Sequence, residues 1–166
     1  MIAIPNWCEN ELNICGEHKD IKKFKEFART EYKNEDGKIE INVLTTEKFI
    51  PYPTKFKKKD EKSENKLATD GFNSGGYEWC IENWGTKWGI CSAEITDELE
   101  SELAYFFESA WAPPTPVILE MSRKFPTLSF ELRYFEQGVG FNGIFVAENG
   151  EVLKDIEAEY FGNRGG

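Results

Sequence analysis

The sequence predicts an α+β fold: an antiparallel sheet with helices packed on one face, ferredoxin-like, and extended by a C-terminal hairpin. Segments with two-residue apolar alternation outnumber helical segments, and turn signals join neighbouring strands. The helical segments lie between pairs of strands, so the element order is β-α-β, a loop, then α-β-β-α-β-β-β. Two βαβ halves with a return between them form the ferredoxin-like plan, and the last two strands extend it.

The first half of the chain should contain a strand, a helix and a second, short strand. Residues 8–15 alternate between apolar and polar side chains, which is typical of a half-buried strand. Residues 18–33 place apolar side chains on one side and lysines opposite, which predicts an amphipathic helix. A turn at residues 36–37 leads into a short strand over residues 39–43. Two prolines should then hold residues 49–53 in an extended conformation.

Residues 55–71 form the stretch of lowest hydrophobicity in the chain. The stretch is rich in charge and has no helical or strand period, so we expect an exposed, mobile excursion. A lid or a partner-binding loop is one interpretation, and a tolerated surface insertion is the simpler one. The excursion is too short to separate two domains, so residues 1–166 should fold as a single domain.

The middle of the chain should contain a helix followed by two strands. Residues 76–84 have apolar side chains at helical spacing, and Gly85 follows as the residue that ends the helix. A strand is expected over residues 88–95. Residues 99–111 fit either a helix or a strand, and we favour the strand because Tyr-Phe-Phe is β-prone and two prolines follow the segment.

The C-terminal part should contain a helix and three strands. Thr115 and Pro116 are a good N-cap and first residue for a helix. Residues 128–136 alternate as a strand. Asn149-Gly150 between two further strands, residues 141–148 and 151–156, is the clearest hairpin signal in the sequence.

The composition excludes several classes of function. The chain has 166 residues, one histidine and a formal net charge of −10. A single histidine excludes sites that need two, and the net charge argues against binding a phosphate backbone. No apolar stretch approaches the length of a membrane span, and the start of the chain lacks a secretory pattern. We therefore expect a cytoplasmic protein without membrane association.

The four cysteines do not have the spacing of a metal site. None are in C-x-x-C spacing, so a zinc site would have to be assembled from four scattered segments. We expect reduced thiols that are mostly buried as small apolar groups. The sequence thus predicts neither a bound metal nor another cofactor. The cysteines are Cys8, Cys15, Cys80 and Cys91.

Charge is distributed unevenly along the chain. Residues 1–66 contain 14 Lys or Arg and 13 Asp or Glu, whereas residues 67–166 contain 6 and 17. One interpretation is that solvated faces in the second half simply use glutamate. The other is an acidic face that binds a basic partner or repels nucleic acid.

Five tryptophans in one small domain are the unusual feature of the composition. They could fill the core and close its ends, or form a partly exposed aromatic platform for a base, a sugar or a partner side chain. By spacing, Trp84 at the end of its helix and Trp88 at the start of the next strand should both face the core. Trp79 lies off that helical stripe and is the better contact residue. The candidate binding residues are Trp79, Asn83, Lys87 and Trp111.

The sequence contains no recognisable catalytic set. Carboxylates near Lys87 would form an acid–base pair only if they were buried against the tryptophans, and exposed carboxylates are far commoner. No G-x-S-x-G elbow or Walker loop is present, and the glycines of residues 138–143 lie in a hairpin, where glycine serves the turn. Enzymatic activity is left open, a non-catalytic role is favoured, and no catalytic residue is assigned.

Three motifs resemble the YubB-type family. They are residues 5–10 (PNWCEN), 79–88 (WCIENWGTKW) and 107–114 (FESAWAPP). Phe125-Pro126 and the later Gly-Phe-Asn-Gly segment also fit the pattern, so the resemblance covers nearly the whole chain. The family consists of proteins of phages, prophages and conjugative plasmids, with a C-terminal ferredoxin-like domain and no established activity. The resemblance implies a fold and an origin but no catalytic residues.

Two classes of function remain. The first is a non-catalytic interaction protein, an accessory factor of a mobile genetic element, whose partner would be a host or mobile-element protein. The alternative is a nucleic-acid-binding or nucleic-acid-processing module that uses the sheet face, which the topology supports and the charge opposes. A negative sheet face would favour the protein partner, and a positive one would favour nucleic acid.

Overall fold

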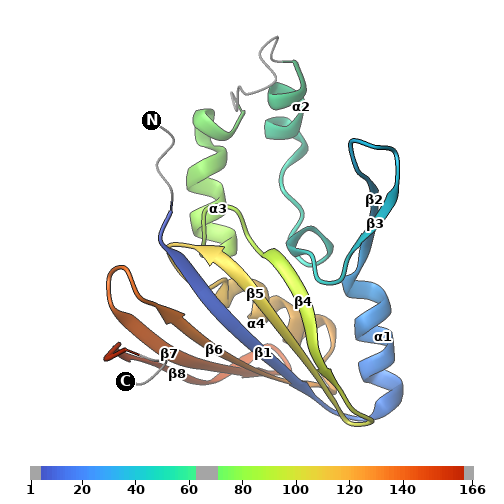
Figure 1. Ribbon diagram of the computed structural model, residues 1–166, viewed down its shortest axis with the longest axis vertical. Coiled ribbons are helices and arrows are strands. Elements are labelled where there is room, and N and C mark those ends of the chain that lie inside the picture. The colour runs from blue at the N-terminus through green and yellow to red at the C-terminus, as the bar shows by residue number, and fades with distance from the viewer. Residues whose placement is uncertain (1–4, 63–70, 163–166) are drawn as a thin grey trace.

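The computed structural model describes residues 5–62 and 71–162, which form a large antiparallel sheet, a small two-stranded sheet and several helices (Figure 1). The large sheet has six strands in the order β4-β5-β1-β6-β7-β8. Every neighbouring pair is antiparallel. The strands are β1 (Trp7–Cys15), β4 (Cys91–Glu98), β5 (Glu102–Ala110), β6 (Ser129–Glu136), β7 (Phe141–Glu148) and β8 (Glu151–Glu159).

The ferredoxin-like plan is present and extended, as the sequence predicts. Two helices, α1 (His18–Ala28) and α4 (Thr115–Lys124), complete the order β1-α1-β4-β5-α4-β6. These four strands lie side by side as β4-β5-β1-β6, which is the arrangement that two interlocked βαβ units produce. Strands β7 and β8 add a C-terminal hairpin at the β6 edge. The predicted fold class is therefore confirmed.

The segment between α1 and β4 departs from the plain ferredoxin-like plan. A hairpin of β2 (Thr30–Lys33) and β3 (Ile39–Asn42) projects away from the large sheet (Figure 1). A single 3₁₀ turn follows, then helix α2 (Thr54–Lys62). A π-type turn over Phe72–Gly76 leads directly into helix α3 (Tyr77–Trp84).

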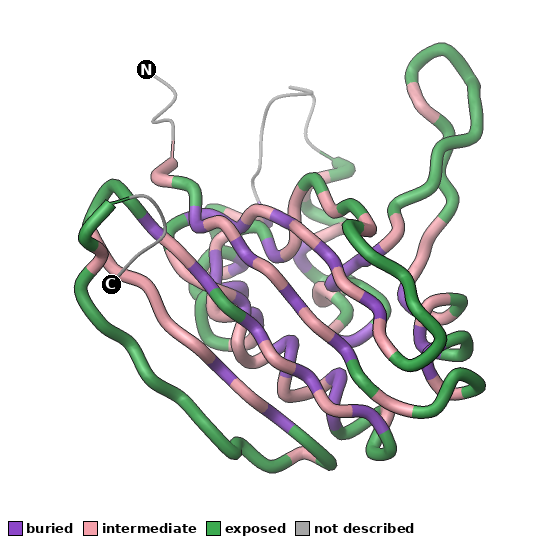
Figure 2. The backbone as a smooth tube through the Cα atoms, turned by 60° about the horizontal axis from the view of Figure 1, so that its bottom comes forward, coloured by how far each residue is buried: buried purple, intermediate pink, exposed green. Residues whose placement is uncertain are grey.

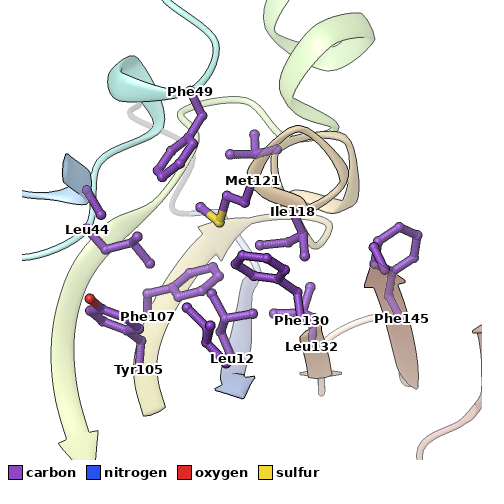
Figure 3. Close-up of a cluster of buried hydrophobic side chains, with 14 of the residues drawn as sticks. Leu12, Leu44, Phe49, Tyr105, Phe107, Ile118, Met121, Phe130, Leu132 and Phe145 are labelled. Atoms are coloured by element: carbon purple, nitrogen blue, oxygen red, sulfur yellow. The ribbon is translucent and has the colours of Figure 1, made fainter. Parts of the chain in front are cut away.

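The core lies on one face of the large sheet, beneath α1 and α4. Side chains alternate along the central strands between buried and partly exposed, which the colours of Figure 2 follow. From the helices, Phe24 of α1 and Ile118 and Met121 of α4 meet the buried faces of the strands. Figure 3 shows Met121 and Ile118 above Leu12 and Phe130. Among the described residues, no helix is long and apolar enough to span a membrane.

The ambiguous segment and the C-terminal hairpin both have the predicted form. Residues 102–110 form β5, and its alternate side chains are buried in the core. Asn149 and Gly150 have φ values of 48° and 77°, the left-handed pair that a tight hairpin turn between β7 and β8 requires. Gly85 has φ 77° and ends α3, as its position predicts.

Several predicted boundaries and conformations are wrong. Helix α1 ends at Ala28, because Arg29 is extended and the chain turns into β2, where the Tyr32 hydroxyl donates to Glu40 at 2.6 Å. Residues 49–53 are not uniformly extended, since Phe49 is helical in backbone conformation. Residues 54–62 form α2, although the sequence has no helical period there. The strand after α3 begins at Cys91, three residues later than predicted.

Candidate functional site

One candidate site is the face of the large sheet opposite α1 and α4. The side chains of β1, β5 and β6 on this face are mostly part-exposed, and α4 lies behind the strands in Figure 1. Part of the face is hollowed, with a volume of about 670 Å³. We call this surface the open sheet face. Its side chains include Glu9, Glu11, Glu94, Glu102, Phe106, Glu108, Glu131, Arg133, Phe135, Ile144, Val146 and Ile156.

The strand register arranges these side chains in rows. In one row Glu108 lies directly opposite Glu9, and such like-charged pairs repel one another. Arg133 donates to Glu131 at 2.9 Å, so this arginine neutralises a glutamate of its own strand. The face therefore has an acidic half over β4, β5 and β1 and a mainly apolar half over β7 and β8, where Lys154 lies opposite Val146. The row that crosses both halves is Glu94, Phe106, Glu11, Arg133, Ile144 and Ile156.

A second candidate site is a cavity of about 420 Å³ beside α3. It lies between α2, the π-type turn, α3 and the loop that follows α3. We call it the aromatic cavity, because four of its eight lining residues are aromatic. Six of its lining residues are Tyr52, Asp60, Phe72, Trp84, Lys87 and Trp88.

Local packing fixes the aromatic walls of this cavity. The Trp84 indole donates to the backbone carbonyl of Ile50 at 2.8 Å, and its ring lies 5.7 Å from that of Tyr52. The absence of a side chain at Gly76 leaves room for the Tyr52 hydroxyl, which a Cβ atom at that position would overlap. The Tyr52 hydroxyl is buried without a hydrogen-bond partner among the described residues. These walls are set before any ligand arrives.

The structure brings only one of the four predicted binding residues to the aromatic cavity. Lys87 lines it. Trp79 packs instead against the core, with its ring 5.4 Å from that of Trp84. Asn83 donates to the carbonyl of Trp79 at 2.9 Å, within the same helix. Trp111 is 41% exposed beyond the end of β5 and lines neither candidate site.

The prediction that Trp88 faces the core is wrong. Trp88 is 40% exposed, because Gly89 turns the chain in the left-handed region before β4 begins at Cys91. Its ring lies 6.0 Å from that of Trp7. The predicted roles of two tryptophans are thus exchanged: Trp79 packs on the core, and Trp88 is the accessible ring.

Sequence reasoning missed the distant residues of both sites. Tyr52 and Phe72 come from segments far from α3, and no local pattern joins them to it. The rows of the open sheet face depend on strand register, which the sequence does not give. Alternation within each strand does place glutamates on one face of β1, and that was the usable signal.

The four thiols and the Tyr52 phenol are held in their neutral forms at neutral pH. Burial raises the pKa of Cys8 to about 12 and that of Cys80 to about 11. Burial also raises the pKa of Cys15 and Cys91. Burial, with a contribution from the negative charge of Asp60, raises the pKa of Tyr52 to about 12. None of these groups is a ready nucleophile at neutral pH.

The described residues contain no group of three or more His, Cys, Asp or Glu side chains that could hold a metal ion. His18 is exposed at the start of α1, with Nδ1 3.2 Å from the carbonyl oxygen of Glu100.

Comparison with known proteins gives a match of fold. Residues 86–163 match the family model described as the ferredoxin-like domain in Api92-like protein. The crystal structure of a protein api92 from Yersinia pseudotuberculosis matches with a TM-score of 0.60 and 11% sequence identity, over 96% of this chain and 99% of that chain. The fold is that of Api92. No curated protein matches the sequence.

The Api92 match agrees with the topology derived above. The matched residues 86–163 contain β4, β5, α4 and β6 to β8, so the family model covers the second βαβ unit and the hairpin that extends it. The likeness to Api92 extends over nearly the full length of both chains, so it includes the segment between α1 and β4. The ferredoxin-like C-terminal domain that the motifs implied is thus present.

Proposed function

We propose that the chain is a non-catalytic interaction protein that binds a cationic, amphipathic segment of a partner protein on its open sheet face. The observation that supports this most directly is the division of that face into an acidic half and an apolar half. A partner segment with lysines or arginines on one side and apolar residues on the other would match both halves at once.

The charges favour such a partner. Glu9 and Glu108 lie directly opposite each other, and Glu11 lies two residues further along β1, opposite Phe106 of β5 and Arg133 of β6. Bringing them together in the folded protein costs repulsion, and a cationic partner relieves it on binding. The attraction should weaken with salt, whereas the contribution of the apolar half should not.

A nucleic-acid-binding role for the sheet face is the alternative that the fold suggests. Ferredoxin-like sheets that bind RNA do so with aromatic side chains on this same face, and Phe106 and Phe135 hold comparable places here. The surrounding glutamates would repel a phosphate backbone. We therefore favour the protein partner.

The raised pKa values of the cysteines and of Tyr52 support a non-catalytic role, since they leave these groups protonated at neutral pH. We further propose, from the resemblance of residues 79–88 and 107–114 to the YubB-type family, that the protein is a cytoplasmic accessory factor of a phage, prophage or plasmid. Its partner would then be a host protein or another protein of the element. Genes for phage or plasmid proteins should adjoin its gene, and a chromosomal setting without them would contradict this origin.

A charge-matched pair of variants tests the binding face. The sheet variant carries Glu9→Gln, Glu11→Gln and Glu108→Gln. The control carries Glu35→Gln, Glu78→Gln and Glu82→Gln, at exposed positions outside the open sheet face. Both variants lose the same charge, so a difference between them reports position and not net charge.

The probe is a peptide of lysine and leucine at amphipathic helical spacing, compared with a scrambled peptide of the same composition and with single-stranded DNA. We expect NMR shift changes on β1, β5, β7 and β8, and at least tenfold weaker binding by the sheet variant only. Equal binding of the scrambled peptide, or equal weakening in the control, would contradict the proposal. Binding of the DNA to the same strands would favour the alternative.

A further inference from the structure

We propose that the aromatic cavity binds a nucleotide, free or at the end of a single strand, with its base among the aromatic rings and its phosphate at Lys87. This inference goes beyond the proposed function, since the cavity shares no lining residue with the open sheet face. Four features of the cavity support it: the aromatic walls, the lysine, the carboxylate and the charge of the surroundings.

The walls suit a planar aromatic ring. Tyr52, Phe72, Trp84 and Trp88 line a volume of about 420 Å³, within the range of small-molecule sites. Aromatic side chains stack on any nucleobase, because every base has a π face. Trp88 is the accessible member, and the Trp7 ring 6.0 Å away supports it. A ring that is partly exposed beside a cavity gains apolar contact when a base enters.

Lys87 places a positive charge in the cavity and so favours a ligand with a negative charge. Its Nζ lies 4.6 Å from the centre of the Trp88 ring and 6.0 Å from that of Phe72. No carboxylate of the described residues forms an ion pair with it. The Lys87 ammonium takes the cation–π position between the two rings, so a cationic ligand cannot bind there. It attracts instead a ligand in which an anionic group is attached to an aromatic ring.

Asp60 joins two walls of the cavity and offers a hydrogen-bond acceptor to a ligand. Its Oδ1 accepts the backbone N–H of Gly71 at 2.8 Å and that of Phe72 at 3.3 Å, which ties α2 to the wall that carries the Phe72 ring. A carboxylate has about four lone-pair sites, so it can also accept a ribose hydroxyl or a base amino group. A nucleotide carries both a phosphate and such donors.

The surroundings of the cavity differ in charge from the open sheet face. Helix α2, which contributes Asp60, contains Lys55, Lys57, Lys58, Lys59 and Lys62 against two carboxylates. Lys57 pairs with Glu47, and the remaining lysines of α2 outnumber its two carboxylates, which favours an anionic ligand beside this helix. An anionic ligand is therefore attracted to α2 and repelled from β1 and β5.

Calorimetric titration of the full chain tests the inference. The probes are AMP, UMP, adenosine, inorganic phosphate and a 5′-phosphorylated single-stranded dT8. The variants are Lys87→Gln and Trp88→Leu, with Lys124→Gln as the matched control. Lys124 also lies over an aromatic ring, that of Phe27 at 5.1 Å, but does not line the cavity. Because Trp88 is partly exposed and Lys87 lies at the cavity surface, the melting temperature of each variant should fall by a few degrees at most.

We expect AMP and UMP to bind at least tenfold more tightly than adenosine or phosphate alone. Lys87→Gln should remove that advantage over adenosine, Trp88→Leu should weaken all ring-bearing probes about tenfold, and Lys124→Gln should change neither. Equal affinity for AMP and dT8 identifies a free nucleotide, and tenfold tighter dT8 binding identifies a strand end. No binding of AMP or dT8 at millimolar concentration, or the same loss in the Lys124 control, overturns the proposal. If the lysine–leucine peptide fails to bind the unmodified protein, that result contradicts the proposed function and leaves the nucleotide site untouched.

Discussion

Trp84 ends helix α3, Trp88 lies in the loop that follows it, and the two rings have opposite environments. Trp84 is 7% exposed, and its indole nitrogen donates to a backbone carbonyl. Trp88 is 40% exposed. Gly85 and Gly89, with φ values of 77° and 71°, turn the chain on either side of it. Two left-handed residues in five thus decide which ring joins the core and which ring is exposed.

Replacing each of these tryptophans by alanine should separate their roles. Trp84→Ala removes a buried ring and a hydrogen bond, so we expect a loss of about 3–5 kcal/mol in the free energy of unfolding. Trp88→Ala should cost about 1 kcal/mol or less, because its ring is already partly hydrated. Urea denaturation measures both. Equal losses would mean that Trp88 is a core residue and that the cavity wall is misassigned.

Helical spacing alone was enough to place Trp84, because a residue four after Cys80 lies on the same buried stripe. Spacing could not place Trp88, whose environment depends on where β4 begins. That start depends on a long-range contact: Thr46 accepts the Ile90 N–H at 2.8 Å and leaves no space for a side chain at Gly89. A local sequence pattern cannot predict such a contact between distant residues.

Helix α2 is an element that the local sequence pattern could not predict. Its segment is so rich in lysine that a search for an apolar stripe finds none, yet residues 54–62 are helical. One buried side chain anchors the helix: Phe56, whose ring lies 5.6 Å from that of Tyr52. The strands of the large sheet were predictable because each has four or more alternating residues, whereas a helix with one anchor gives no period. Residues 63–70 of the predicted excursion lie outside the described residues, and the mobility of the excursion stays a prediction.

Loss of this anchor should release α2 without unfolding the domain. We expect Phe56→Ala to raise the rate of tryptic cleavage after Lys57, Lys58 or Lys59 at least tenfold, because the helix would lose its main apolar contact. The global melting temperature should fall much less than for Trp84→Ala. Timed proteolysis with mass spectrometry measures the cleavage, and Lys22→Ala in α1 is a surface control. An unchanged cleavage rate would mean that other contacts hold α2.

At the scale of the whole molecule, the fold places acidic and basic side chains on different surfaces. The sequence shows only that the two halves of the chain differ in charge. Strand alternation was enough to predict the ferredoxin-like sheet and its terminal hairpin, since a period of two assigns each side chain to a face. It was not enough to predict the register between neighbouring strands, and so could not show that Glu9 and Glu108 meet. The result is a molecule with an acidic sheet face and a lysine-rich helix beside an aromatic cavity.

Buried thiol and phenol groups make the stability of the fold sensitive to high pH. Burial raises the pKa of Cys8 and of Tyr134 to about 12, from ordinary values of 9.0 and 10.0. In the unfolded chain these groups lose their protons near the ordinary values, while the folded chain retains them. Their contribution to stability is therefore complete below about pH 9 and is lost as pH rises toward 12. For Tyr134 alone the two-unit shift corresponds to about 3 kcal/mol.

We accordingly expect the free energy of unfolding to be level between pH 7 and about pH 9 and to fall steeply above about pH 10. Tyr134→Phe removes one of the ionising groups, so its stability should fall less over the same range, even where it is less stable at pH 7. Tyr77→Phe, at an exposed position in α3, is the control and should follow the parent protein. Urea denaturation at each pH measures the three curves. If Tyr134→Phe kept the slope of the parent protein, the phenol would be ionising in the folded state as readily as in water, and its burial beside Phe141 and Gly143 could not be as tight as the structure has it.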